Sequence, residues 1–200
     1  MSAVEPIAHD YFEYLKAKFT IDVSQIFEEK GFAVIDNFFS EFDAIKLHEE
    51  LLMLGEEGLM RPNKTHFAST KVKGQYSLFE KPGIFEVDFH QPSLRDLAAT
   101  MNSFFTFSAD GFIESLQKNF PSYKLIRSDS ARTLKAQWNK GGGACFPMHY
   151  DNPGPNSNRS LTCIMYFNKD WIPDHGGELT LYPFLSQRVV IPPLFNRLVV

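Results

Sequence analysis

The chain is predicted to form one α+β domain, because helical patterns fill its first two-thirds and strand patterns its last third. Apolar side chains at helical spacing follow capping-type starts at Ser40 and Ser93. From residue 132 onward, short apolar segments alternate with turn residues. Helices followed by strands favour an antiparallel sheet or barrel supported by helices. We therefore divide this domain into a helical and strand support region, residues 1–130, and a barrel core, residues 131–200.

Each expected element has its own local signal. Gly55 and Gly58 are expected to end the helix that begins at Ser40, and proline and glycine interrupt the chain between residues 59 and 92. Before residue 130, the expected elements are a helix near 6–19, a strand at 31–36, a helix at 40–54, strand pieces near 76–79 and 84–89, and a helix at 93–119 that breaks near residue 110. After it, strands are expected at 132–138, 146–150, 160–167, 178–182, 187–191 and 197–200.

The last of these strands is apolar and reaches Val200 without a turn. Such a strand would leave an apolar edge open to association. We therefore expect the C-terminal strands of the domain to be truncated in this chain.

Composition excludes several classes of protein. The 200 residues are 44% hydrophobic and 22% charged, with a net charge of −4 and no long basic run, which argues against nucleic acid as a partner. No apolar stretch of membrane-spanning length and no signal-peptide pattern occurs. Two cysteines, Cys145 and Cys163, do not suggest a disulfide scaffold. We expect an intracellular protein, cytoplasmic or nuclear, that does not bind a membrane.

The most specific chemical signal is the pair His149 and Asp151, which follows the glycine-rich run 141–143. Residues two apart on an extended segment point to the same face. An imidazole and a carboxylate there are two of the three ligands of the 2-His-1-carboxylate triad that holds non-haem Fe(II). His175 is the nearest substitute for the third ligand, but its place in a turn before Gly176 favours a solvated histidine.

Several segments together resemble the Fe(II)/2-oxoglutarate-dependent oxygenases of the prolyl 4-hydroxylase superfamily, and most closely their intracellular oxygen-sensing branch. They are His149-Tyr-Asp-Asn-Pro153, Arg159, Leu161-Thr-Cys-Ile-Met-Tyr-Phe-Asn-Lys-Asp-Trp171, Gly176-Gly-Glu-Leu179 and Phe195-Asn-Arg-Leu-Val-Val200. The resemblance spans about a third of the chain, residues 134–200. It implies a double-stranded β-helix, a jelly-roll barrel, with helices packed on one sheet.

The resemblance also implies roles for single residues. His149 and Asp151 match the first two metal ligands. Tyr166 matches a position whose hydroxyl faces the distal carboxylate of 2-oxoglutarate, and Leu179 matches an apolar wall of the same pocket. Ile164 shares the strand face of Tyr166 and is expected to line that pocket. Asn139 stands where the branch often carries a pocket tyrosine, and its amide can still hydrogen-bond a carboxylate.

The implied activity is hydroxylation of a prolyl residue in a protein substrate. It consumes O₂ and 2-oxoglutarate at an Fe(II) centre, releases succinate and CO₂, and uses L-ascorbate (vitamin C) to keep the iron reduced. The distal histidine ligand and the arginine that pairs with 2-oxoglutarate are expected after Val200. The 200-residue form is therefore expected to be inactive.

Two alternatives remain open. The same oxygenase chemistry can act on a different protein side chain, or the chain can be a truncated, non-catalytic binding module. For single features, the simpler interpretations are a flexible loop at 141–143, an inert core thiol at Cys163, and structural or surface roles for Arg159 and Arg197.

Overall fold

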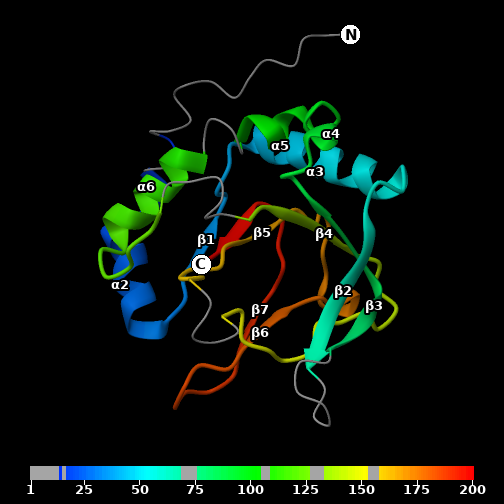
Figure 1. Cartoon of the computed structure of the whole chain (residues 1–200). Coiled ribbons are helices and arrows are strands. Elements are labelled where there is room, and N and C mark those ends of the chain that lie inside the picture. The colour runs from blue at the N-terminus through cyan, green and yellow to red at the C-terminus, as the bar shows by residue number, and fades with distance from the viewer. Residues whose placement is uncertain (1–13, 15–16, 69–75, 105–108, 127–132, 153–157) are drawn as a thin grey trace.

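The computed structural model describes residues 14, 17–68, 76–104, 109–126, 133–152 and 158–200. Its strands form three small antiparallel sheets with helices around them, which confirms the α+β prediction at that level (Figure 1). The helices are α2 (Ile21–Lys30), α3 (Glu41–Glu56), α4 (Pro92–Arg95), α5 (Ala99–Ser103) and α6 (Ala109–Asn119), with a 3-10 turn at Pro173–His175. None of the helices described here is both long and apolar enough to cross a membrane.

The strands are β1 (Val34–Asp36), β2 (Arg61–Ala68), β3 (Tyr76–Asp88), β4 (Lys135–Asn139), β5 (Ile164–Tyr166), β6 (Leu179–Leu181), β7 (Val189–Ile191) and β8 (Arg197–Val199). The sheet orders are β1–β8–β5, β2–β3–β4 and β6–β7, and every pairing is antiparallel. Figure 1 shows α3, α4 and α5 above the strands and α2 with α6 beside them. The helices thus cover the strand assembly from two sides.

The two longer N-terminal helices begin at side-chain caps. The Thr20 hydroxyl accepts a hydrogen bond from Val23 N at 3.3 Å at the start of α2, and the Ser40 hydroxyl accepts one from Asp43 N at 3.2 Å at the start of α3. The cap at Ser40 was predicted from its sequence. Helix α2 was not predicted, and the helix expected near residues 6–19 lies largely outside the described residues.

Gly55 was predicted to end α3, and that prediction is wrong, because the helix continues to Glu56. A Cβ atom at Gly55 would lie 2.3 Å from the Trp138 ring, so glycine is required there by close packing against β4. Gly58, with φ of +69°, follows the helix end and agrees with the predicted role. The same contact places α3 against one face of the β2–β3–β4 sheet.

The helix predicted at 93–119 is divided earlier than expected. Helix α4 is a single turn, Leu97 after it is 49% exposed, and the predicted break near residue 110 falls inside α6. Glu50 of α3 explains how α5 starts separately: its carboxylate accepts hydrogen bonds from Thr100 N at 2.6 Å and Met101 N at 2.8 Å. These N–H groups would otherwise lack partners at the new helix end.

Most strands predicted after residue 130 form at the expected places but are shorter, whereas other strand predictions fail. Strand β2 was missed, and the two pieces near 76–79 and 84–89 are one strand, β3. The strand predicted at 146–150 does not form, because no strand of the described residues pairs with that segment. The strand predicted at 160–167 is reduced to β5, which pairs with β8.

The main core is unusually aromatic. Phe19, Phe27 and Phe120 are at most 6% exposed, and the Phe27 and Phe120 ring centroids lie 4.5 Å apart. Phe38 and Phe39 follow β1 and extend this cluster toward the strands, since Phe39 stacks on Phe167 at 6.0 Å. Side chains from both sides of residue 131 contribute to this core, and the division at 130/131 stays a prediction.

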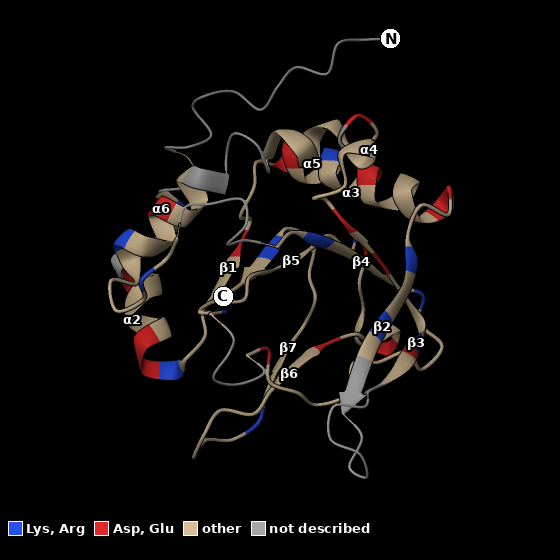
Figure 2. Ribbon diagram, viewed as in Figure 1, with Lys and Arg blue, Asp and Glu red and all other residues tan. Residues whose placement is uncertain are grey.

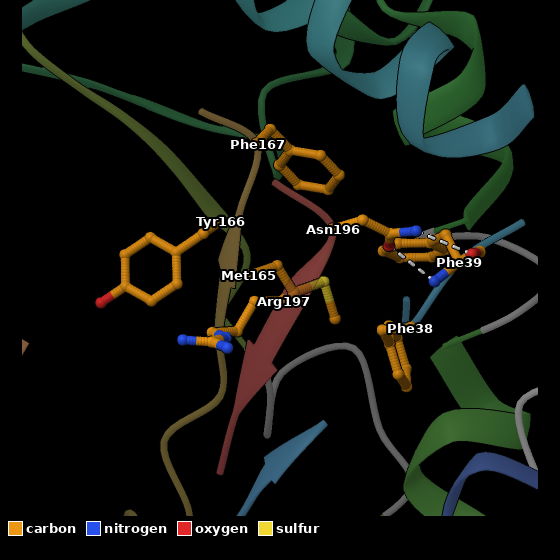
Figure 3. A pocket seen from close by; sticks show the side chains of 7 residues that line it. All are labelled: Phe38, Phe39, Met165, Tyr166, Phe167, Asn196 and Arg197. Carbon is orange, nitrogen blue, oxygen red and sulfur yellow. Dashed lines mark hydrogen bonds between the residues drawn. The ribbon is translucent and has the colours of Figure 1, made fainter. Parts of the chain in front are cut away.

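Asn196 links the segment after β1 to the end of β5 by hydrogen bonds to Phe39 and Tyr166 (Figure 3). Its side-chain amide forms two hydrogen bonds with the backbone of Phe39, at 2.8 and 2.9 Å, and its own N–H donates to Tyr166 O at 2.8 Å. Its φ of +58° is one that asparagine tolerates better than most residues. The β1, β5 and β8 ends are thereby held in one register.

Candidate metal centre

The structure brings the side chains of His149 and Asp151 together. His149 Nε2 lies 3.2 Å from Asp151 Oδ1, and the side chains are 52% and 40% exposed. Two ligands bound at about 2.1 Å and at right angles on one ion would have donor atoms about 3.0 Å apart. The observed separation therefore fits two adjacent ligands of a single metal ion. The convergence arises in an irregular segment, without the strand that the sequence predicted.

The tautomer of His149 also suits a ligand. His149 Nδ1 lies 2.7 Å from the Pro147 carbonyl oxygen, which can only accept a hydrogen bond, so Nδ1 carries the proton. In the neutral ring, Nε2 then presents a lone pair toward the carboxylate of Asp151. Two acceptors that face each other at 3.2 Å require a proton or a cation between them. Orientation of a metal-binding histidine by a backbone carbonyl is a common arrangement in metal sites.

Arg159 also contacts Asp151. Its Nη1 atom donates to the Asp151 backbone oxygen at 3.2 Å and lies 3.6 Å from Oδ1. Asn152 strengthens this turn, because its side-chain amide donates to Arg159 O at 3.1 Å. The sequence analysis expected a structural or surface role for Arg159 and did not predict this contact. No local sequence pattern predicts this contact, because Arg159 and Asp151 are eight residues apart.

No third metal-binding side chain joins this pair in the part of the chain that the structure describes. His175, the substitute considered from sequence, lies exposed in the 3-10 turn, where its Nδ1 is 3.4 Å from Ile172 N. The donor set present fits two positions of a non-haem Fe(II) site, and His149 and Asp151 are the residues that would hold the ion.

Tyr166 lies on β5 with its ring directed away from Phe38 and Phe39 (Figure 3). Burial raises the pKa of its hydroxyl to about 12, so the group stays protonated and able to donate. Within the described residues, this hydroxyl has no hydrogen-bond partner. A half-buried donor of this kind is suited to receive a carboxylate.

The other residues predicted to line the pocket, Ile164, Leu179 and Asn139, differ in their surroundings. Ile164 shares the Tyr166 face of β5, and half-buried Leu179 begins β6. Asn139 ends β4 and is exposed, and its amide is engaged with its own loop. Its Nδ2 donates to Ala144 O at 3.1 Å, and its Oδ1 accepts from Gly141 N at 2.9 Å. In this arrangement Asn139 shapes the loop that leads to His149.

The two cysteines, Cys145 and Cys163, have free thiols. Burial raises the pKa of Cys163 to about 12, which keeps that thiol protonated, as an inert core cysteine would be.

Arg197 forms a forked pair with Asp36, with Nε–Oδ1 at 2.6 Å and Nη2–Oδ2 at 2.9 Å. This pair lowers the pKa of Asp36 through the side-chain hydrogen bond. Arg197 thus joins β8 to β1.

Comparisons with known proteins bear on the same region. Residues 135–200 match the 2OG-Fe(II) oxygenase superfamily. A 60-residue segment is 40% identical to the rat protein "Prolyl hydroxylase EGLN3", covering 29% of this chain and 25% of that protein. Over 174 residues the chain is 26% identical to human "Egl nine homolog 1", covering 84% of this chain and 37% of that protein. The chain thus spans well under two-thirds of these relatives.

Solved structures agree in fold. A prolyl 4-hydroxylase from Phytophthora capsici matches with a TM-score of 0.80 and 33% identity, covering 99% of this chain and 59% of that one. A prolyl hydroxylase from Trichoplax adhaerens, solved with a hypoxia inducible factor peptide fragment, matches with a TM-score of 0.72 and covers 95% and 79%. At 22% identity that match bears on the fold alone. Residues 135–200 thus carry the 2OG-Fe(II) oxygenase match, and the chain is distantly similar to the EGLN prolyl hydroxylases and alike in fold to prolyl 4-hydroxylases.

Proposed function

We propose that this protein is an Fe(II)/2-oxoglutarate-dependent dioxygenase that hydroxylates a prolyl residue in a protein substrate, with succinate and CO₂ as products. The observation that carries the proposal is the 3.2 Å approach of His149 Nε2 to Asp151 Oδ1 within the family-matching segment. A double-stranded β-helix barrel is the architecture that we propose around it, with the three small sheets as its parts.

The protein's own groups would have separate tasks. His149 Nε2 and Asp151 Oδ1 would bind the ion, while the Pro147 carbonyl and Arg159 keep both side chains in orientation. An Fe(II) ion held there, with 2-oxoglutarate and O₂, supplies the oxidative chemistry. The Tyr166 hydroxyl would donate to the far carboxylate of 2-oxoglutarate, with apolar walls from Ile164 and Leu179.

L-ascorbate as a reductant, a proline-containing protein as substrate and an intracellular setting, cytoplasmic or nuclear, belong to the same proposal. The Trichoplax structure was solved with a peptide fragment, which supports a peptide as the substrate class. Two free cysteines are compatible with a thiol-reducing compartment.

A second candidate is a binding module without turnover. It is favoured by the lack of a third metal-binding side chain beside His149 and Asp151 in the described ranges. The same chemistry on another side chain would need the same metal pair, so it differs from the main proposal only in the substrate.

The test combines succinate release with mass spectrometry of proline-containing peptides, under Fe(II), 2-oxoglutarate and ascorbate. A gain of one oxygen on proline, lost in His149→Ala, supports the prolyl hydroxylase. Oxygen on another residue favours the alternative substrate. Peptide binding with neither succinate nor modified peptide favours the binding module.

A further inference from the structure

A loop without regular secondary structure, residues 140–148, leads from β4 to the candidate metal pair. Its three consecutive glycines, residues 141–143, all have positive φ, between +64° and +84°, and a Cβ at any of them would meet no atom within 4 Å. Glycine loses more conformational freedom than any other residue when its backbone is fixed. Contacts outside the glycine run are therefore needed to hold His149 and Asp151 in place.

The first half of the loop is attached to β3 and β4. Lys140 N donates a hydrogen bond to Gly83 O at 2.9 Å. The Lys140 ammonium lies 4.6 Å from the centre of the Phe85 ring and 4.7 Å from that of Trp138, so two aromatic rings hold one cation. These contacts precede the glycines and fix only the start of the loop.

The second half of the loop is attached to β3 by a contact in which the strand supplies the lysine and the loop supplies the ring. Lys81 of β3 is half-buried, and its Nζ lies 4.1 Å from the centre of the Phe146 ring. A cation within about 6 Å of a ring centre is attracted by the face of the ring. This contact follows the glycines and lies three residues before His149.

The Phe146 ring lies beside the imidazole of His149. The two ring centres are 6.4 Å apart, and the ring planes meet at 36°. The immediate neighbours of His149 in the sequence, Met148 and Tyr150, are 82% and 92% exposed and offer the imidazole little packing. Among the described residues, the Phe146 ring and the Pro147 carbonyl that accepts the Nδ1 proton therefore restrict the orientation of His149.

We propose that Lys81 is a positioning residue for the metal pair: its ammonium fixes the Phe146 ring, and that ring keeps His149 Nε2 turned toward Asp151. The inference rests on the proposed function, because it concerns the ion that His149 and Asp151 would bind. Without the contact to Lys81, the Phe146 ring can leave the strand, and His149 spends less time in the orientation seen here. The affinity for the ion then falls in proportion to the population that is lost.

The charge of Lys81 acts in the opposite direction, which makes the role testable. A positive charge near a metal site repels the ion, so its removal would strengthen metal binding if Lys81 acted through charge alone. A lysine that positions His149 predicts weaker binding after the same change. A lysine that only stabilises the fold would lower the melting temperature and leave the metal affinity of the folded chain unchanged.

The experiment measures the dissociation constant of Mn(II) for the full chain from the electron paramagnetic resonance signal of free Mn(II). Lys81→Met keeps a long side chain without the ammonium, and it should raise this constant about two- to fivefold, the factor that corresponds to an exposed cation–π contact. Lys81→Arg should restore the affinity, because a guanidinium also binds aromatic faces. Lys64→Met is the matched control and should change nothing, because Lys64 lies on β2 and pairs with exposed Glu80 at 3.7 Å.

A double-mutant cycle tests whether Lys81 acts through Phe146. Phe146→Leu alone should weaken Mn(II) binding at least as much as Lys81→Met, and adding Lys81→Met to Phe146→Leu should cause no further loss. Unchanged or tighter binding in Lys81→Met, equal losses in Lys81→Met and Lys64→Met, or additive losses in the double variant would overturn the role. Thermal melts check that each titration uses folded protein.

Further results separate failure of this role from failure of the proposed function. In the metal-free chain, a nuclear Overhauser contact between the Phe146 and His149 rings should disappear in Lys81→Met, and its persistence there would overturn the role whatever the activity. Mn(II) binding that depends on Lys81, without oxygen added to proline, would keep the role and remove the prolyl substrate. Hydroxylated proline with Mn(II) binding independent of Lys81 would do the reverse, and a chain that binds no Mn(II) would overturn both the metal pair and this role.

Discussion

On the helical side, the rings of Phe19, Phe27 and Phe120 are buried against one another. Around the candidate metal centre, the side chains of His149 and Asp151 are about half exposed, His149 is hydrogen-bonded to the Pro147 carbonyl, and Asp151 is hydrogen-bonded to Arg159. Figure 2 shows how the charged residues are distributed over the strands. Stability and metal binding therefore reside in different regions, and changes in one should leave the other largely intact.

The largest expected effect is on metal binding in Asp151→Ala. Removing the carboxylate takes away one of the two ligands of the described residues, so binding of Fe(II), or of Mn(II) as its stand-in, should be lost. The melting temperature should barely change, because Asp151 is exposed. Calorimetric titration under anaerobic conditions measures the binding. Asp174→Ala, which removes an exposed carboxylate beside His175, is the control and should bind like the unaltered chain.

The converse change is Phe120→Ala. Phe120 is fully buried, and the loss of its ring should lower the free energy of unfolding by about 3–5 kcal/mol. Denaturant unfolding gives this value, and Phe120→Leu should lose clearly less. At a temperature where the variant is still folded, its metal affinity should equal that of the unaltered chain. A parallel loss of metal binding would show that the two regions are coupled.

Tyr166→Phe should affect the cosubstrate and spare the metal. A hydrogen bond to a charged group contributes about 1.5–3 kcal/mol, so 2-oxoglutarate affinity should fall about ten- to a hundredfold. Titration of 2-oxoglutarate into metal-loaded protein measures it, and a metal titration of the same variant is the control. An unchanged affinity would identify Tyr166 as a core residue only.

The smallest effect concerns the pair of Asp36 and Arg197. The hydrogen bond from Arg197 holds the pKa of Asp36 below its ordinary value of 3.8. Its stabilisation is therefore fully present above that pH and is lost as the pH falls through the lower, folded-state value. Asp36→Asn should remove this acid dependence at a cost of less than about 1 kcal/mol, because Asp36 is exposed. Unfolding curves between pH 2 and 6 compare the two proteins.

The sequence was most informative where one local rule decides the outcome. The Ser40 cap depends on residues three apart, and the structure contains it. His149 and Asp151 also approach each other as expected, but in an irregular segment instead of the predicted strand. Gly55 was misread because its reason lies in Trp138, more than eighty residues away. The Glu50 cap of α5, the Arg159 contact and the Lys135–Glu86 pair likewise join residues apart in the sequence, and no periodicity encodes them.

The central claim is that His149 Nε2 and Asp151 Oδ1 bind one metal ion. The most direct measurement follows the imidazole resonances of all six histidines by NMR during a titration with Mn(II). The account predicts that His149 broadens first at low Mn(II), while His175 and His48 stay sharp, and that Asp151→Ala abolishes this selectivity. Broadening that begins at His175, or that is unchanged in Asp151→Ala, would contradict it.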